Sequence, residues 1–315
     1  MSRILITGGL GYVGGRLSRR LSEEHEVWVS SRRPVPEDIL RLHGQVKRID
    51  HVLLFDPATF PASVDVVIHL AALNEIDSVK FPSEAIRVNI DETRMILENS
   101  ISKKVDQFIY FSTAHIYGAP LEGTITEDSL PRPVHPYAIT HRAAEDYIVA
   151  AAKHKRIQGT VLRLSNSFGA PVSAHVNRWT LLANDLCKQA VEKGAITLRS
   201  NGCQYRDFIC LADVEEVMSK MLTDPQFPEH IIYNLGSGIS MRVIDMADSI
   251  IQSAVTVLKK NISLDLPAES LPTDEPSLNY SIGRLLTDGY HIANDVNIEL
   301  ERLLQFCAEN FVHHE

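Results

Sequence analysis

The fold is decided near the amino terminus, where residues 3–14 read RILITGGLGYVG. An apolar run, Ile4–Ile6, leads into a glycine-rich turn, and an amphipathic stretch with Leu17 and Leu21 on one side follows. Glycines spaced G-x-x-G-x-x-G between a strand and a helix permit a tight turn and let a pyrophosphate approach the N–H groups that open the helix. The stretch therefore predicts a dinucleotide site at Gly8, Gly11, Tyr12, Val13 and Gly14.

Short β-branched runs continue to alternate with amphipathic stretches along the chain. This alternation is typical of βαβ units, which build a parallel sheet with helices on both faces. We expect an α/β fold, a Rossmann-type doubly wound parallel sheet with a smaller C-terminal α/β substrate lobe. The expected strands are Arg3–Thr7, Glu26–Ser30, Val52–Phe55, Val64–Leu70, Phe108–Ser112 and Gly159–Leu164, and the expected longer helices are Tyr12–Glu24, Glu84–Ser100 and Tyr137–His154.

After about Asn166 the alternation is less regular, with prolines spread through the sequence. We therefore expect the NAD(P)-binding Rossmann domain to span residues 1–165, with strand and helix returns near 203–223. The smaller substrate-binding lobe is expected from residues 166–202 and 224–315.

Composition narrows the classes of partner. The 315 residues carry 31 Lys and Arg against 40 Asp and Glu, a net charge of −9, with no long basic run, so nucleic acid is not an expected partner. No secretory signal or membrane-length apolar stretch is visible, which predicts a cytoplasmic protein without a membrane partner. The four cysteines lack the Cys-x-x-Cys spacing of metal sites, so we expect ordinary thiols and no metal.

The end of the second expected strand bears on which dinucleotide is bound. An Asp or Glu at that point would hold the ribose 2′-hydroxyl of NAD, but here the strand ends in Ser30, Ser31, Arg32 and Arg33. Guanidinium groups there can pair with a 2′-phosphate. We therefore predict NADP, with NAD as the alternative if the two arginines are only solvated loop charges.

Further motifs follow in order along the chain. They read HLAA at 69–72, FSTAHIYG at 111–118, PYAITH at 136–141, LRLSNSFG at 162–169, RDF at 206–208 and YNLGSG at 233–238. With the glycine loop, this set resembles the extended short-chain dehydrogenase/reductase family, also called the NAD-dependent epimerase/dehydratase family, in its nucleotide-sugar-modifying type.

The resemblance implies roles for particular residues. Tyr137 would exchange a proton with a substrate oxygen during hydride transfer, and Thr113 would hydrogen-bond that oxygen. The remaining implied cofactor contacts are Leu70, Ala71, Ala72, Asn89, Tyr137 and His141, and the implied substrate contacts are Thr113, Asn166 and Arg206. For Arg206 the alternative is a structural arginine paired with an acidic side chain, and Arg178 and Trp179 could add a cation and a stacking face. The family also implies a homodimer formed by helices such as 84–100 and 137–154.

Two departures from the family pattern qualify the implied activity. The family lysine four residues after the tyrosine is replaced by His141, which we expect to be catalytic together with Thr113 and Tyr137. Its charge at neutral pH depends on whether burial or a nearby anion dominates. The acidic pair of the 4,6-dehydratases is replaced by Ala114 and His115, which disfavours a dehydratase of that mechanism. The expected function is a nucleotide-sugar epimerase or keto-sugar reductase. The alternative is a cofactor-binding protein with lost or reduced catalysis.

Overall fold

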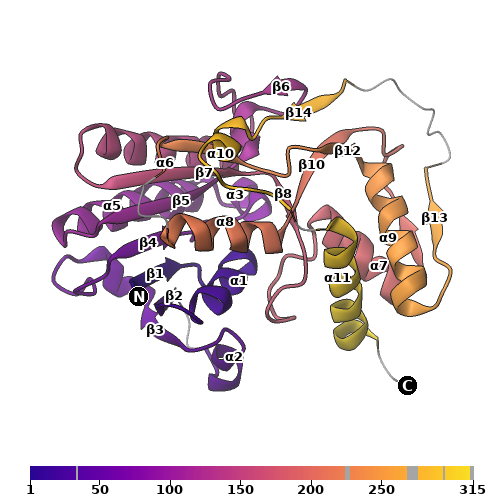
Figure 1. Ribbon diagram of the computed structural model, residues 1–315, viewed down its shortest axis with the longest axis horizontal. Coiled ribbons are helices and arrows are strands. Elements are labelled where there is room, and N and C mark those ends of the chain that lie inside the picture. The colour runs from indigo at the N-terminus through magenta and orange to yellow at the C-terminus, as the bar shows by residue number, and fades with distance from the viewer. Residues whose placement is uncertain (33–34, 224–227, 268–275, 294, 313–315) are drawn as a thin grey trace.

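The structure is a computed structural model that describes residues 1–32, 35–223, 228–267, 276–293 and 295–312. Its centre is a parallel sheet whose seven described strands lie in the order β11-β7-β5-β4-β1-β2-β3 (Figure 1). The order reverses beside β1, as in Rossmann folds, and places the glycine-rich turn at the carboxyl edge of the sheet. The strands are β1 (Arg3–Thr7), β2 (Glu26–Ser31), β3 (Val46–Asp50), β4 (Val66–His69), β5 (Gln107–Thr113), β7 (Gln158–Leu164) and β11 (Ile232–Leu235).

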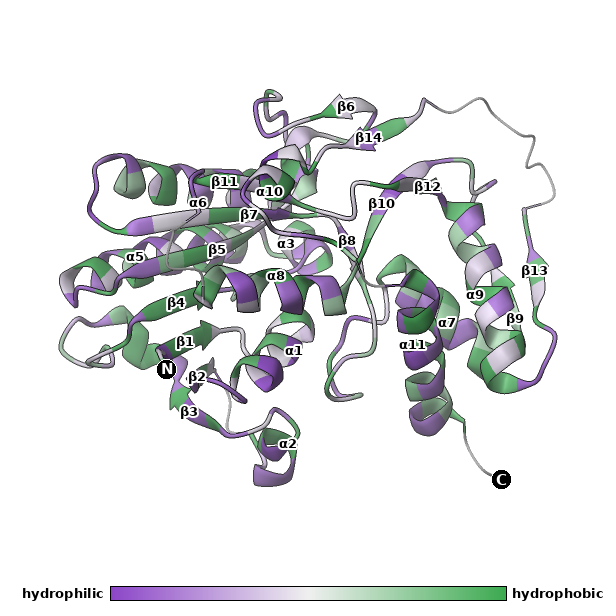
Figure 2. Cartoon of the chain, in the orientation of Figure 1, coloured by the Kyte–Doolittle hydropathy of each residue, from purple (hydrophilic) through white to green (hydrophobic). Residues whose placement is uncertain are grey.

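Both faces of this sheet are buried, which explains its nearly continuous apolar strands (Figure 2). In β1, Ile4 and Ile6 join the core under α1 (Tyr12–Leu21) and α8 (Leu211–Thr223). Leu5 points the other way, into the core under α5 (Thr93–Ser102) and α6 (Pro136–Lys153). The predicted doubly wound α/β fold is therefore confirmed.

A second group of elements packs around its own apolar core. The helices there are α7 (Leu182–Lys193), α9 (Val243–Leu258) and α11 (Val296–Phe311), and the paired strands are β9 (Ala195–Thr197) and β13 (Ser263–Asp265). A three-stranded sheet, β8 (Asn166–Phe168), β10 (Tyr205–Cys210) and β12 (Ser240–Arg242), lies between the central sheet and these helices (Figure 1). Trp179 packs against this core, because its ring lies on Phe306 and Phe311. Its ring faces are therefore used by the protein and do not serve as the ligand-stacking surface considered from the sequence.

Two expected elements differ from the structure. The strand expected at Val52–Phe55 is a 3-10 helix, η1 (His51–Phe55), because the Asp50 side chain accepts from Val52 N and only His51 and Leu54 are buried. The helix expected over 84–100 is a succession of α4 (Pro82–Ile86), a π-helical turn η2 (Arg87–Glu92) and α5.

The smaller elements complete the chain: α2 (Glu37–Arg41), α3 (Glu75–Lys80), η3 (Ala114–Tyr117), β6 (Gly123–Ile125), β14 (Leu278–Tyr280) and α10 (Gly283–Thr287). Residues 224–315 were expected to lie in the second lobe, but β11 is the edge strand of the central sheet and α10 contacts it. None of the described helices has the length and hydrophobicity needed to cross a membrane.

Candidate active site

The glycine-rich turn after β1 is closed too tightly for side chains. Gly8 has φ +68°, and a Cβ there would lie 3.0 Å from the backbone nitrogen of Ala71. A Cβ on Gly14 would lie 2.2 Å from the carbonyl oxygen of Gly8, because the first turn of α1 passes directly over the loop. The turn therefore presents bare backbone and the N-terminus of α1 to a cavity of about 920 Å³.

Residues beside this turn hold it in place. Thr7 Oγ1 accepts from the backbone nitrogens of Leu70 and Ala71, at 3.2 Å each, so the loop after β4 is fixed against the glycine turn. The Tyr12 hydroxyl turns toward the second lobe, where it donates to the carbonyl of Gly169 at 2.9 Å. Gly8, Gly11, Tyr12, Val13, Gly14, Leu70, Ala71 and Ala72 all line the cavity.

Asn89 is placed differently from the other expected cofactor residues, because it does not line the cavity. It is fully buried, and its Oδ1 accepts from Leu73 N at 2.6 Å while its Nδ2 donates to Thr140 Oγ1 at 2.9 Å. Asn89 thus ties the loop after β4 to α6, and its contribution to the site is to position that loop.

The end of β2 brings Ser31 and Arg32 to the cavity wall, while Arg33 lies outside the described residues. Sequence reasoning missed two neighbours. His51 bonds Ser30 Oγ through Nδ1 at 2.9 Å, and its Nε2 lies 3.5 Å from the buried carboxylate of Glu92. Both His51 and Glu92 line the cavity, so a carboxylate from a distant helix lies near the place where β2 itself offers none.

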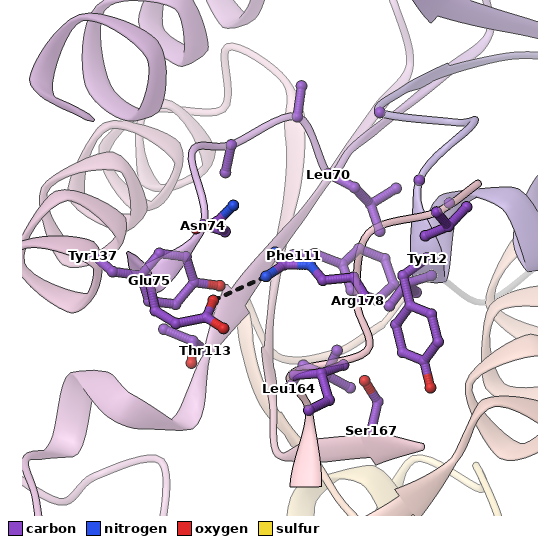
Figure 3. A pocket seen from close by; sticks show the side chains of 18 of the residues that line it. Tyr12, Leu70, Asn74, Glu75, Phe111, Thr113, Tyr137, Leu164, Ser167 and Arg178 are labelled. Atoms are coloured by element: carbon purple, nitrogen blue, oxygen red, sulfur yellow. Dashed lines mark hydrogen bonds and ion pairs between the residues drawn. The ribbon is translucent and has the colours of Figure 1, made fainter. Parts of the chain in front are cut away.

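Tyr137 and Thr113 line the same cavity from α6 and from the end of β5 (Figure 3). Thr113 Oγ1 accepts from His115 N at 3.2 Å, which leaves its O–H available to donate. Burial raises the pKa of the Tyr137 phenol to about 12, against a lowering by the charge of Arg178. The neighbouring Ser112 hydroxyl is buried in the cavity wall without a hydrogen-bond partner among the described residues.

His141 lies one helical turn beyond Tyr137 and is 2% exposed. Its Nδ1 is 2.6 Å from the hydroxyl of Tyr110, and its buried Nε2 has no hydrogen-bond partner within the described part of the chain. Burial lowers the pKa of His141 to about 3. Of the two opposing effects that the sequence left open, burial therefore dominates, and the imidazole is neutral at physiological pH.

The second lobe contributes Arg206 and Asn166 to the cavity wall. Arg206 is not paired with the adjacent Asp207, because that carboxylate accepts instead from Ser165 Oγ and from the backbone of Ser237 and Gly238. No carboxylate within the described residues pairs with Arg206, whose guanidinium donates to the carbonyl of Tyr205, and burial lowers its pKa. The desolvated cation is thus directed to the cavity without a protein anion to neutralise it.

Arg178 enters the cavity from the segment before α7. Its NH1 lies 3.0 Å from the carboxylate of Glu75 on α3, so this ion pair crosses from the second lobe to the Rossmann side. Figure 3 shows the guanidinium reaching toward Glu75, with Tyr137 and Thr113 on the same side of the view as Glu75.

The fold and this cavity define a Rossmann-type α/β protein. Its glycine-rich turn, which includes Gly8, Gly11 and Gly14 and is called the glycine cradle below, faces a second lobe. The chain belongs to the NAD dependent epimerase/dehydratase family, whose model matches residues 4–236. This confirms the family that the sequence motifs indicated.

Two relatives illustrate the range of the family. The dTDP-D-glucose 4,6-dehydratase of Mus musculus is 27% identical over 275 residues, which cover 79% of this chain and 72% of the mouse protein. The UDP-glucose 4-epimerase of Corynebacterium glutamicum is 26% identical over 287 residues, which cover 86% of this chain and 83% of that protein.

Among solved structures, the UDP-glucuronic acid 4-epimerase of Bacillus cereus, in complex with UDP-glucuronic acid and NAD, superposes with a TM-score of 0.81. It is 24% identical to this chain, and the match covers 98% of this chain and 100% of the other. That likeness establishes the fold over nearly the whole chain.

Proposed function

We propose that this protein is an NAD(P)-dependent nucleotide-sugar epimerase or keto-sugar reductase in which Tyr137 is the acid/base. The observation that carries the proposal is that Tyr137 and Thr113 line one cavity with the glycine cradle and with Arg206. A cofactor held at the cradle and a substrate anchored at Arg206 would therefore have their reacting ends beside the phenol.

The glycine cradle fits a dinucleotide, since side chains on Gly8 or Gly14 would fill the space that a pyrophosphate needs. When bound, the nicotinamide supplies hydride transfer at a sugar carbon. NADP is the preferred cofactor, supported by Arg32 on the cavity wall and by the lack of a carboxylate at the carboxyl end of β2, which reads Ser30-Ser31. The buried Glu92 is the feature that favours NAD, because a carboxylate can accept from a ribose 2′-hydroxyl.

Tyr137 and Thr113 perform the proton chemistry in this proposal. In the oxidative direction the Tyr137 oxygen, as phenolate, takes the proton from the sugar hydroxyl while the hydride leaves the carbon. In the reductive direction the phenol returns that proton to the carbonyl oxygen. Thr113 donates its O–H to the same oxygen and thereby holds it toward Tyr137.

A nucleotide sugar is the proposed substrate class. Arg206 can place two N–H donors on a phosphate, and Asn166 lines the wall next to it. The names of the relatives, which act on dTDP- or UDP-sugars, support the class and leave the sugar and the nucleotide open.

Water elimination is disfavoured within this proposal, because Ala114 and His115 occupy the positions of the dehydratase acidic pair. The carboxylates on the described cavity wall are Glu75 and Glu92, and both are engaged, with Arg178 and with Arg87 respectively. Because one relative is named a 4,6-dehydratase, a dehydrated keto-sugar is among the products to be sought.

The test is a product assay with a panel of UDP- and dTDP-sugars, run with catalytic NAD(P) for epimerisation and with stoichiometric NAD(P)H for reduction. Turnover in the wild type that is lost in Tyr137→Phe, with cofactor binding retained, supports the proposal. Cofactor binding without turnover on any substrate, in both wild type and His141→Lys, supports the alternative of a binding protein with lost catalysis. Activity unchanged in Tyr137→Phe contradicts the proposed role.

A homodimer is the proposed assembly, through the helices of residues 84–100 and 137–154. Its support is that Ile86, Ile139 and Tyr147 on these helices are exposed apolar side chains. Sedimentation equilibrium of the wild type and of Ile139→Glu tests this assembly, since a monomeric wild type contradicts it.

We also propose the division into a Rossmann domain and a substrate lobe, with β11 and α10 assigned to the former.

A further inference from the structure

The helix that carries Tyr137 provides no positive charge beside it. His141 occupies the position of the family lysine, but its ring is buried, bonded to Tyr110, and neutral. A phenol that works as a base must nevertheless be stabilised as an anion, and a nearby cation is the usual means. The cation must then come from another element.

The charged groups around Tyr137 leave few candidates. On β5, Tyr110 is a neutral phenol whose pKa burial raises further. On β7, Arg163 is held by Glu145 of α6 at 2.8 Å. On η2, Glu92 is engaged by Arg87.

The groups that remain on the cavity side are His115 of η3, which is exposed, the ion pair Arg178–Glu75, and Arg206 of β10. Of the two guanidiniums, Arg206 is assigned to the substrate phosphate in the proposed function, whereas Arg178 reaches the cavity from the opposite lobe and points toward Glu75 and Tyr137 (Figure 3). Its side chain is 27% exposed and that of Glu75 is 37% exposed, so the pair is partly shielded from solvent.

We propose that Arg178 supplies the positive charge that stabilises the Tyr137 phenolate, in place of the lysine absent from position 141, and that Glu75 positions the guanidinium and moderates its effect. The inference rests on the proposed function, because it concerns the acid/base role of Tyr137. In this inference both residues act through Tyr137: Arg178 stabilises its phenolate, and Glu75 holds the guanidinium of Arg178 in place.

The electrostatics of the two rings agree with this geometry. Burial is the main cause that raises the pKa of Tyr137, the charge of Arg178 lowers it, and Glu75 has a smaller, opposite effect. After burial, the charge of Arg178 is also the largest influence that lowers the pKa of His141. Figure 3 shows the guanidinium of Arg178 pointing toward Glu75 and the phenol ring of Tyr137.

The arrangement has a chemical advantage over a histidine cation. A guanidinium stays protonated throughout the working pH range, so its support for the phenolate does not switch off as pH rises. It carries five N–H donors, and its hydrogen bond to Glu75 uses one of them. Arg178 can therefore stay bonded to the carboxylate of Glu75 while it faces the Tyr137 phenolate.

The experiment measures kcat/KM against pH for the wild type, Arg178→Met, Arg178→Lys and Glu75→Gln. Loss of the cation should move the acidic limb, where the phenol ionises, upward by about one pH unit in Arg178→Met, and should lower the rate about tenfold at a fixed pH below that limb. Arg178→Lys should keep most of the charge effect, and Glu75→Gln should move the limb to lower pH. Tyrosinate absorbance of each variant, with its Tyr137→Phe counterpart subtracted, should shift in the same directions and requires no substrate.

An acidic limb at the same pH in all four proteins overturns the inference, even if Arg178→Met is slower at every pH, because a uniform loss indicates substrate binding or structure alone. Should Arg178→Met fail to fold, the limb of Glu75→Gln decides, and an unmoved or upward-shifted limb contradicts us. The proposed function fails separately, if Tyr137→Phe retains full turnover.

Discussion

The imidazole of His141 lies edge-on against the phenol ring of Tyr137, with ring centroids 4.3 Å apart and ring planes at 66°. The Tyr110 hydroxyl can satisfy its donor by bonding Nδ1 at 2.6 Å, which places the remaining imidazole hydrogen on Nε2. His141 is thus a neutral, buried neighbour of the proposed acid/base, and its effect on Tyr137 is exerted through packing and hydrogen bonding.

The burial of His141 predicts an acid-sensitive fold. Its pKa is about 3 in the folded protein against about 6.5 when unfolded, and His69 has the same shift because of burial. The unfolded chain therefore binds more protons between these values, so stability present above pH 6.5 is lost as pH falls toward 3. Each histidine contributes up to about 1.4 kcal/mol per pH unit in that window.

Urea denaturation at pH 7, 6, 5 and 4 measures this effect. His141→Gln should show a shallower loss of unfolding free energy with falling pH than the wild type. Exposed His175 provides the control, because His175→Gln should follow the wild-type slope. Equal slopes in all three proteins would contradict a neutral buried His141.

Tyr137→Phe should lower turnover by a factor on the order of 10² or more, because it removes the only oxygen that the side chain offers for proton transfer. Cofactor affinity should change little, since the ring still packs against His141. Thr113→Val should reduce kcat less than Tyr137→Phe, because Thr113 orients the substrate oxygen and transfers no proton. Steady-state kinetics with calorimetric cofactor titration measures both. Greater loss in Thr113→Val than in Tyr137→Phe would reverse the assigned roles.

Arg32→Ala should narrow the preference for NADP(H) over NAD(H), because the exposed guanidinium would pair with a 2′-phosphate that NAD lacks. The expected loss is about tenfold in NADP affinity, or about 1.4 kcal/mol, with NAD affinity unchanged. Glu92→Gln tests the alternative that NAD is the cofactor. If the Glu92 carboxylate holds the ribose 2′-hydroxyl, this variant should bind NAD more weakly than the wild type does. Tighter binding of NAD(H) than NADP(H) by the wild type contradicts the preference.

The sequence was sufficient where local pattern carries the information. The glycine spacing predicted the cradle, and the alternation of short apolar runs with amphipathic stretches predicted a parallel sheet with helices on both faces. The strand prediction at Val52–Phe55 was wrong. It rested on a short apolar run, but the Asp50 side chain caps this segment and it forms a 3-10 helix.

Long-range contacts could not be predicted in the same way. Glu75 and Arg178 are 103 residues apart, and no periodicity links them. His51 of η1 and Glu92 of η2 likewise approach to 3.5 Å although they are far apart in sequence, so the spacing of residues around β2 could not predict a carboxylate near its end. The protonation state of His141 also required the structure, because burial and neighbouring charge act on it in ways that the residue type alone leaves open.

Gly8→Ala should abolish tight cofactor binding, and Gly194→Ala is its matched control. The two glycines have nearly equal positive angles, φ +68° and +67°, so alanine at either site adopts a left-handed conformation that costs about 1–2 kcal/mol. Around Gly194 a new Cβ meets nothing within 4 Å, whereas at Gly8 it lies 3.0 Å from backbone atoms of Leu70 and Ala71.

Both variants should therefore lose similar intrinsic backbone stability, with an additional loss in Gly8→Ala from displacement of the loop after β4. Because that loop and the glycine turn together line the cavity, Gly8→Ala should also bind NADP(H) at least about tenfold more weakly, while Gly194→Ala should bind as the wild type does. Urea denaturation and calorimetric titration of the two folded variants measure the two effects separately. If Gly8→Ala bound the cofactor with the affinity of Gly194→Ala, the dinucleotide would not lie against this turn, and the cofactor assignment would have to be abandoned.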